Sequence, residues 1–284
     1  MTKLGRLLLK WLKKLQKGGF NTLFGGQRVR SAVYPLQIPL PLDKNTDWQP
    51  FHIFKGATAG MREFSSHVSG LMPGHCPHPP HRHPEEELLL LLSGEIDIIV
   101  PDATDQEGKV RRHLKAGEFV YYPHYFAHTL EATGESAANY LMFKWHTRRQ
   151  DKSAGLAFGC FNILTSGVNE RNDDGFHLNR IFEGHTAYLS KLECHFSTLS
   201  PKAGYAPHVD NHDVVIVVLK GQVETLGQRV SPYDVIFYAA GEPHGMLNPG
   251  EEVAKYLVFE FHALKTPFLH WMHLCRKIIN LFRD

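Results

Sequence analysis

The chain has 284 residues, of which 43% are hydrophobic and 21% are charged, a balance that is ordinary for a soluble globular protein. Its formal net charge of +2 gives no overall electrostatic signature for a nucleic-acid partner, and it holds no apolar stretch of 18 residues that would form a transmembrane helix. Its four cysteines form no C-x-x-C pair, which argues against a disulfide framework and fits a reducing compartment. We therefore expect a cytoplasmic protein with no nucleic-acid partner.

The first predicted element is a basic amphipathic helix over residues 1–19. Within residues 3–17 the basic side chains recur on one helical face, and the apolar side chains lie largely opposite. Lysines interrupt the apolar run and no small-residue cleavage site follows, so a signal peptide is not expected. Two interpretations stay open: the helix packs against the body of the protein or a partner in a homodimer, or it makes a peripheral contact with an anionic membrane.

The main chemical signal is the segment HRHPEEELLLLLSG, from His81 to Gly94. His81, His83 and Glu87 have the same parity, so on an extended chain their side chains project from one face. Two imidazoles and a carboxylate at this spacing can bind one metal ion, and His128 further along the chain is available as a fourth ligand. Three nearby residues are expected to be bystanders or to support the ligands from behind: His75, Cys76 and His78.

The chain repeats itself at an offset of 128 residues. IFKGATA at residues 53–59 returns as IFEGHTA at residues 181–187. The offset falls from 128 to 116 along the chain, because the second copy lacks most of the loop between residues 101 and 113. The matching pairs are His67 and His195, His81 and His208, Gly94 and Gly221, and His128 and His244. This ordered self-similarity indicates two copies of one domain, which we place at residues 20–146 and 154–265 with a polar linker at residues 147–153.

Each copy is predicted to consist mostly of β-strands. Short apolar or alternating segments are bounded by Gly, Pro and Asp turns: LLLLLSGEIDIIV, EFVYYP and ANYLMFKW in the first copy, and VVIVVLKGQVE, DVIFYAA and AKYLVFEF in the second. Short strands at regular spacing favour a sandwich or a barrel, and an HxH strand that pairs with a distant histidine strand favours a jelly roll. The predicted fold class is therefore all-β, with two tandem barrels.

The second copy keeps only part of the ligand pattern. His208 and Asp210 occupy the HxH positions and His244 matches the last ligand, but Val214 replaces the glutamate. Together, His208, Asp210 and His244 would make a site of two histidines and one carboxylate, as in non-haem iron centres, and His212 shares their parity as a spare candidate. The alternative is a copy that has lost its metal and is kept for its core and its interface.

The last predicted element is another amphipathic helix, over residues 266–284. Thr266 suits a helix cap, Pro267 suits the first turn, and a polar stripe follows. Like the N-terminal helix, it is expected to pack against the body of the protein or a dimer partner.

These motifs resemble those of the cupins, and the duplicated chain resembles a bicupin. The first cupin motif has the form G-x5-HxH-x3,4-E-x6-G. The chain matches it at His81, His83, Glu87 and Gly94, whereas Gly74 lies one residue too far upstream. The second motif has the form G-x5-PxG-x2-H-x3-N. The chain matches it at Gly117, Pro123 and His128, with Tyr125 and Ala132 in place of the glycine and the asparagine.

The resemblance implies that His81, His83, Glu87 and His128 hold a divalent transition metal inside the N-terminal barrel. Fe(II) is the expected metal, and Mn, Ni, Co and Zn suit the same ligands. Residues from two separate segments can leave one or two coordination positions open, which distinguishes a catalytic metal site from a structural one.

The leading functional prediction is an Fe(II)-type oxygenase that acts on a small organic substrate in the N-terminal barrel. Alternate members of an aromatic and apolar set are expected to line the cavity, or else to belong to the core: Tyr121, Tyr122, Phe126, Met142 and Trp145. One alternative is a non-redox isomerase, lyase or decarboxylase that acts on a sugar or a carboxylic acid. Another is a module that only binds a small molecule. Glu85 and Glu86 would move protons in the non-redox case, or be solvated acids in a turn.

Overall fold

The computed structural model describes residues 27–43, 45–102, 108–147, 151, 155–163 and 175–264. Within these ranges the chain forms nineteen β-strands and no helix, which confirms the predicted all-β fold class. The described residues accordingly include no helix that is long and apolar enough to cross a membrane. Both predicted terminal helices, residues 1–19 and 266–284, and most of the predicted linker 147–153 lie outside the described residues.

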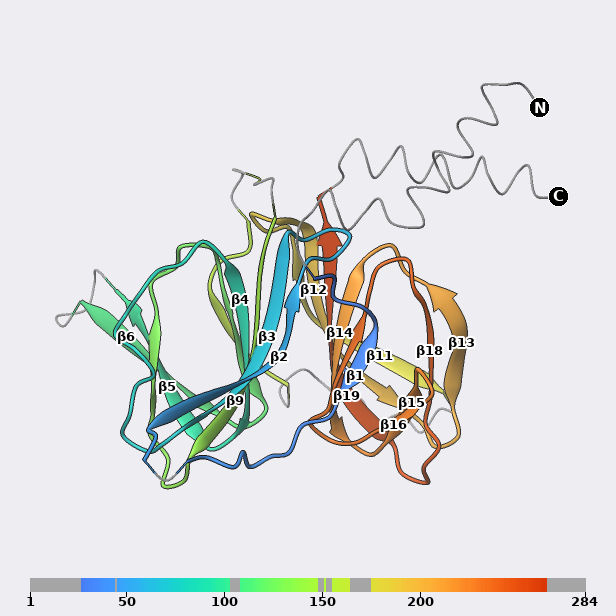
Figure 1. Cartoon of the computed structure of the whole chain (residues 1–284), viewed down its shortest axis with the longest axis horizontal. Coiled ribbons are helices and arrows are strands. Elements are labelled where there is room, and N and C mark those ends of the chain that lie inside the picture. Colours follow the sequence, from blue (N-terminus) through green and yellow to red (C-terminus); the bar gives the residue numbers. More distant parts are fainter. Residues whose placement is uncertain are drawn as a thin grey trace, which may run out of the picture.

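The strands form two barrels, each made of a larger and a smaller sheet (Figure 1). The larger sheet of the N-terminal barrel runs in the order β10 (Gly159–Asn162), β7 (Glu118–Tyr122), β4 (Glu86–Ser93), β9 (Ala138–His146), β3 (Glu63–Leu71) and β2 (Trp48–Gly56). Its smaller sheet runs in the order β6 (Lys109–Lys115), β5 (Glu95–Pro101) and β8 (Thr129–Ala132).

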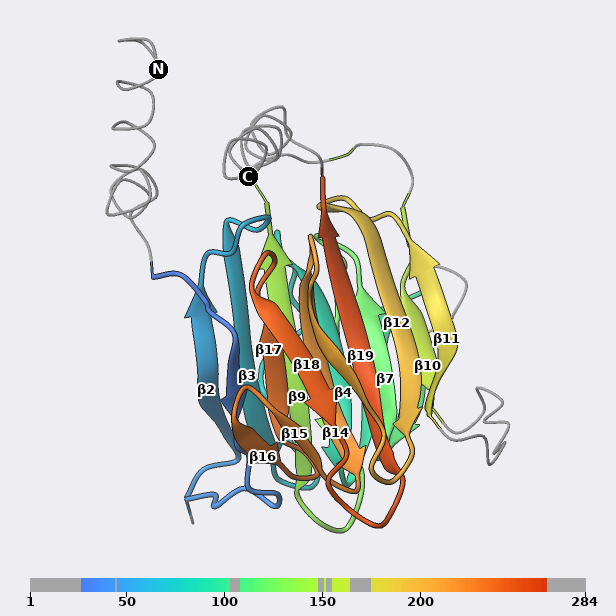
Figure 2. The same ribbon diagram turned by 90° about the vertical axis from the view of Figure 1, so that its right-hand side faces the viewer.

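The C-terminal barrel repeats this plan. Its larger sheet runs in the order β1 (Ala32–Tyr34), β17 (Val235–Tyr238), β14 (Asp213–Lys220), β19 (Ala254–Ala263), β12 (Leu189–Leu199) and β11 (Phe176–Gly184). Its smaller sheet runs in the order β13 (Gly204–Val209), β18 (Pro243–Leu247), β15 (Val223–Thr225) and β16 (Gln228–Val230). Figure 2 looks onto this barrel, with the strands of the N-terminal barrel behind it.

Each barrel takes one edge strand from the sequence of the other copy. Strand β1, which precedes the first copy's core strands, pairs with β17 of the C-terminal barrel. Strand β10, which precedes the second copy's core strands, pairs with β7 of the N-terminal barrel. The sheets therefore cross the predicted copy boundaries at residues 20–146 and 154–265, and the exchange ties the two barrels together through backbone hydrogen bonds.

The two larger sheets pack face to face on a shared core rich in phenylalanine. Phe64 of β3 lies 5.0 Å from Phe261 of β19 between ring centroids. Phe119 of β7 lies 5.5 Å from Phe259 of β19 in an edge-to-face arrangement. Each such pair contributes about 0.5–1.5 kcal/mol beyond the burial of its apolar area. The barrels thus form one continuous hydrophobic unit.

Strand β4 shows why the sequence contains an uninterrupted apolar run. Leu88, Leu90 and Leu92 face the shared core between the sheets, whereas Leu89 and Leu91 face the interior of the N-terminal barrel. A strand that is covered on both faces has no solvent side, so its apolar residues need not alternate with polar ones.

The same alternation separates Glu86 from Glu87. Glu87 points into the barrel, while Glu86 points into the interface and is fully buried, which corrects the expectation of a solvated turn acid. Trp145 Nε1 donates to Glu86 at 2.8 Å, Thr186 Oγ1 at 2.6 Å and the Ala187 amide at 2.8 Å. Burial raises the pKa of Glu86 to about 7, against the lowering effect of these hydrogen bonds.

The first copy makes the reciprocal contact to an acid of the second copy. This explains why both repeated segments, IFKGATA and IFEGHTA, end in threonine and alanine. Asp213, which matches Glu86 in the repeat, is buried, and its carboxylate accepts hydrogen bonds from Ala240 and Thr58. Thr58 Oγ1 also accepts from two amides of its own turn, at 3.2 and 3.0 Å, and Thr186 Oγ1 does the same at 3.2 and 3.0 Å. Each copy therefore uses its threonine turn to satisfy a buried acid of the other copy.

Candidate metal centre

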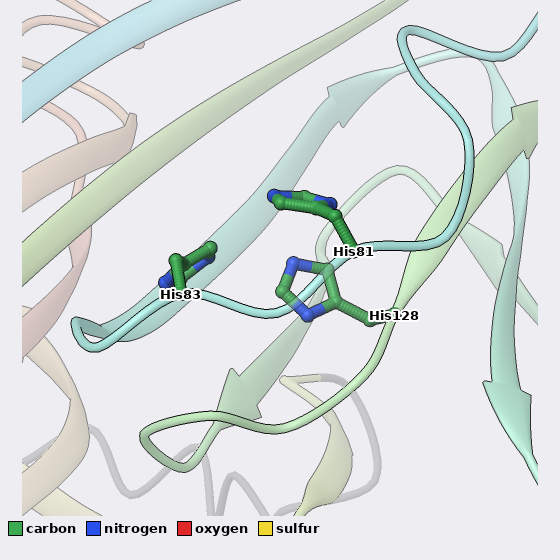
Figure 3. Close-up of side chains that lie close together, drawn as sticks. All are labelled: His81, His83 and His128. Atoms are coloured by element: carbon green, nitrogen blue, oxygen red, sulfur yellow. The ribbon is translucent and has the colours of Figure 1, made fainter.

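The first predicted ligand set is assembled by β-pairing between two distant segments. His81 lies before β4 and forms an antiparallel bridge with His128, with backbone N–H to O distances of 3.2 Å in both directions. His83 follows two residues after His81, and Glu87 lies near the start of β4. Figure 3 shows the three imidazole rings gathered around one space.

The distances bring all four predicted ligands together. The ligand atoms of His81, His83 and His128 all lie within 4.8 Å of one another. Glu87 Oε2 lies 3.1 Å from His83 Nε2, and Glu87 Oε1 lies 3.9 Å from His128 Nε2. Glu87 is fully buried, and its Oε1 has no hydrogen-bond partner. A buried carboxylate oxygen without a partner, beside three convergent imidazoles, is the arrangement that a cation would satisfy.

Backbone carbonyl groups orient two of the rings. His128 Nδ1 lies 2.9 Å from Phe126 O, and His83 Nδ1 lies 3.1 Å from Glu85 O. A proton on each Nδ1 would leave the Nε2 lone pair free for a metal, which is the usual role of such contacts. The His128 ring also stacks on Tyr122 at 4.1 Å, so it is held from behind.

The electrostatics favour the metal-binding forms of three of the ligands, which are His81, His128 and Glu87. Burial lowers the pKa of His81 to about 4, with further lowering by the neighbouring His78, His128 and His83, so this ring is neutral near pH 7. Burial also lowers the pKa of His128. For Glu87, burial acts to raise the pKa, but Lys144 and the adjacent histidines outweigh it and hold the pKa below its usual range. Neutral imidazoles and an ionised carboxylate are what a divalent metal requires.

A cavity of about 290 Å³ adjoins these ligands. Its walls combine apolar side chains such as Trp48 and Leu130 with the polar groups of His52, His67 and Lys144. Lys144 on β9 is paired in register with Glu87, and its Nζ lies 3.0 Å from Glu87 Oε2. These three polar residues were not in the predicted set. The registered pairing of β4 with β9 is the signal that places Lys144 here, and it cannot be read from a single strand.

The predicted aromatic set is split between the two faces of its strands. Met142 lines the cavity, and Tyr122 supports His128. Phe126 stacks on Phe158 at 4.8 Å. Two members face the shared core between the barrels and not the cavity: Tyr121 and Trp145. Of the histidines expected to be bystanders, His78 lines the cavity and its ring lies 3.9 Å from that of His81, which fits a supporting position.

The second predicted set is also brought together, at the corresponding place in the C-terminal barrel. The ligand atoms of His208, Asp210 and His244 lie within 4.8 Å of one another. His208 and His244 are paired in register between β13 and β18, and His244 stacks on Tyr238 at 4.0 Å. Val214, at the position of Glu87, is buried in the apolar core of this barrel.

Comparison with known families agrees with the fold and with the motifs. Residues 67–144 match the family model for the cupin domain, a stretch that contains all four predicted ligands of the first site. The N-terminal barrel therefore belongs to the cupin superfamily. A search of curated protein sequences found no match to this cupin.

Solved structures share the two-barrel fold of this cupin. Ylba from E. coli has a TM-score of 0.59 at 15% identity and covers 87% of this chain and 98% of its own. AerE from Microcystis aeruginosa has a TM-score of 0.56 at 13% identity, with coverage of 82% and 99%. A mutant oxalate decarboxylase from Bacillus subtilis has a TM-score of 0.55 at 13% identity, with coverage of 84% and 79%. Identities this low show the fold alone.

Proposed function

We propose that this cupin is a metal-dependent enzyme whose reaction takes place in the N-terminal barrel. One observation carries the proposal. The buried Glu87 Oε1 has no hydrogen-bond partner and lies beside three convergent imidazoles at the wall of a cavity of about 290 Å³. A structural metal site would not need that adjoining space, whereas a catalytic site needs room for a substrate.

The proposed ligands are His81, His83, His128 and Glu87, and the proposed metal is Fe(II). Three neutral imidazoles and one carboxylate suit Fe(II) and also Mn, Co, Ni or Zn. When bound, such a metal supplies either redox chemistry or Lewis-acid polarisation of a substrate oxygen.

The cavity walls favour a small substrate that has both a carboxylate and an apolar part. Lys144 is the cationic group of the cavity, and 24% of its side chain is exposed. It would bind a substrate carboxylate beside the metal, while Trp48, Pro50 and Leu130 would exclude water and pack on the apolar part. We propose that the reaction is an oxygen-dependent oxidation of this substrate, because a confined and largely apolar cavity next to a metal protects such chemistry from water.

A second candidate is a non-redox isomerase, lyase or decarboxylase that acts on a sugar or a carboxylic acid. It is favoured by the polar part of the cavity, where His52, His67 and Lys144 can carry protons. The His52 and His67 rings lie 6.2 Å apart between centroids. One structural relative is an oxalate decarboxylase, whose substrate is a small dicarboxylate.

Metal analysis and oxygen consumption separate the two candidates. Full-length protein purified without added metal is analysed for its metal, then mixed with small aromatic and aliphatic carboxylates in an oxygen electrode. The oxygenase proposal expects bound iron and substrate-dependent oxygen uptake, both lost in His81→Ala with His83→Ala and kept in the surface control His113→Ala.

A protein that holds only zinc and takes up no oxygen would contradict the oxygenase. Turnover of uronates or keto-sugars without oxygen would then establish the non-redox candidate. Ligand binding that is unaffected by loss of the metal, with no turnover, would reduce the protein to a binding module.

The predicted cytoplasmic location, the homodimer and the peripheral membrane contact stay proposals. The membrane contact is proposed for residues 1–19, on the basis of their basic residues. Sedimentation with anionic vesicles, for the wild type and for a variant with Lys10, Lys13 and Lys17 changed to Glu, tests it. Equal sedimentation of the two proteins would leave the homodimer or the protein body as the partner of this segment.

A further inference from the structure

A further group of histidines surrounds a carboxylate in the C-terminal barrel, and it includes His212, the spare candidate of the second predicted ligand set. We call it the Glu260 cluster, and its members are His195, His212, Glu260 and His262. The three Nε2 atoms lie 3.5, 3.3 and 2.8 Å from oxygens of the Glu260 carboxylate. The ligand atoms of His212, Glu260 and His262 all lie within 4.8 Å of one another.

Three neighbouring strands position the Glu260 cluster. His195 lies on β12, Glu260 and His262 lie on β19, and His212 immediately precedes β14. These strands are adjacent in the larger sheet (Figure 2). Val258 and Glu260 are two residues apart on β19, so their side chains point to the same face of the sheet. Val258 belongs to the core of the C-terminal barrel. The cluster therefore lies on the barrel side of the sheet, opposite the face that packs on the N-terminal barrel.

The repeat relates these groups to residues of the first barrel. In the first barrel Glu87 of β4 is paired in register with Lys144 of β9. In the second barrel the corresponding pair is Val214 of β14 and Glu260 of β19. The carboxylate of the second barrel therefore lies on the neighbouring strand of the corresponding sheet. With it, the cluster offers three imidazoles and one carboxylate, the same donor types as the first site.

The local contacts hold the rings of the cluster against one carboxylate. The His212 and His262 rings stack at 3.9 Å with an interplanar angle of 19°, and the Nε2 atoms of both rings lie beside Glu260 Oε2. His195 is buried, and its Nδ1 lies 2.8 Å from Ser197 Oγ, which fixes the ring with Nε2 toward Glu260.

A neighbouring cation, Lys191, is already paired with another carboxylate. Lys191 Nζ lies 3.9 Å from Glu260 Oε2, but it makes a closer ion pair with Glu193. Arg180 Nε also donates to Glu193, at 2.8 Å. An ion can reach the cluster, since the side chains of His212, Glu260 and His262 are 17%, 21% and 25% exposed.

We propose that His212, Glu260 and His262, with His195 as a fourth ligand, bind a divalent transition metal in the C-terminal barrel. Imidazole and carboxylate donors favour Zn(II), Co(II) or Ni(II) over Mg(II) or Ca(II). Its ligands are different residues from the set predicted at His208, Asp210 and His244, and it does not depend on the chemistry of the N-terminal barrel.

Co(II) binding to the metal-stripped full-length protein tests the proposal. In His81→Ala with His83→Ala, which disables the first site, we expect one remaining equivalent of Co(II) with a visible absorption band. Adding His212→Ala and His262→Ala should remove that equivalent, whereas adding His208→Ala and His244→Ala should leave it. Glu260→Gln keeps the shape of the side chain and should weaken Co(II) binding by about 100-fold, at least as much as the loss of an outer partner of a metal ligand.

Circular dichroism and thermal melting establish that each variant is folded, so that a loss of metal is not a loss of structure. A folded His81→Ala, His83→Ala protein that binds no Co(II) would overturn the proposal and leave the cluster as a hydrogen-bonded ion pair. Loss of the remaining equivalent through His208→Ala and His244→Ala, but not through His212→Ala and His262→Ala, would also overturn it and place the metal at the predicted second set.

Discussion

The two barrels share a histidine arrangement but differ at the registered pair of residues beside it. Both bring two distant histidines together by antiparallel pairing, His81 with His128 and His208 with His244. Both also stack a tyrosine on the later histidine, at 4.1 and 4.0 Å. The pair beside them is Glu87 with Lys144 in the N-terminal barrel, and Val214 with Glu260 in the C-terminal barrel.

This difference in one pair of residues changes what each barrel can bind. In the N-terminal barrel the buried carboxylate reaches the histidines next to a cavity of about 290 Å³. In the C-terminal barrel a valine closes the same position into an apolar core, and the carboxylate gathers a different set of histidines. One fold thus supports two arrangements of similar donors, because the site depends on a few side chains and not on the backbone plan.

The largest expected effect is a loss of activity when the histidines of the N-terminal barrel are changed, but not when those of the C-terminal barrel are. His81→Ala with His83→Ala should lower kcat/KM by more than the roughly 100-fold that follows loss of an outer partner of a metal ligand, because two ligands are removed. The matched pair His208→Ala with His244→Ala should retain turnover. Steady-state kinetics of the two double variants measure the contrast, and an equal loss in both would break the assignment of the reaction to the N-terminal barrel.

Lys144→Met should act on substrate binding more than on metal content. A charge-assisted hydrogen bond contributes about 1.5–3 kcal/mol, so KM for a carboxylate substrate should rise by roughly 10-fold or more. The metal content should stay the same, and a neutral ester of the substrate should be insensitive to the change. Lys115→Met, on the surface of the same barrel, is the control. Loss of metal without a change in KM would mean that Lys144 serves Glu87 and not the substrate.

Removing the metal should lower the thermal stability of the protein. At free metal 100-fold above Kd, each occupied site adds about 2.7 kcal/mol to the free energy of unfolding. Glu87→Gln should therefore remove the part of the metal-dependent melting shift that belongs to the N-terminal site. A shift that is unchanged by Glu87→Gln would mean that the stabilising ion binds elsewhere.

The smallest predicted effect tests the symmetry of the interface. Thr186→Val and Thr58→Val each remove a hydroxyl that bonds a buried acid of the other copy, at an expected cost of about 1–2 kcal/mol in each case. Urea unfolding midpoints measure the two costs, with the exposed loop residue change Thr133→Val as the control. A cost at only one of the two positions would show that the contact is not reciprocal.

The duplication and the grouping of His81, His83 and Glu87 could be predicted because they depend on local order, whereas His128 was placed with them by the resemblance to the cupin motifs. The shared parity of His81, His83 and Glu87 places them on one face, and the repeat supplies His208, Asp210 and His244. The continuous apolar run of β4 is likewise explained by burial on both faces.

Other features that depend on pairing between distant strands, and that no motif marks, could not be predicted. Lys144 lies in the site because β9 pairs with β4 in that register. Glu260 lies beside His212 and His195 because β14 and β12 both pair with β19. Glu86 looked like a solvated acid because its neighbours in sequence are charged, but the second barrel covers it. The exchanged strands β1 and β10 are short, and nothing local marks their partners.

The most direct test is anomalous diffraction from crystals of the full-length protein loaded with its metal, recorded on both sides of the metal's absorption edge. Our account predicts a strong anomalous peak enclosed by His81, His83, Glu87 and His128. A metal-saturated protein with no peak among these four residues would contradict it.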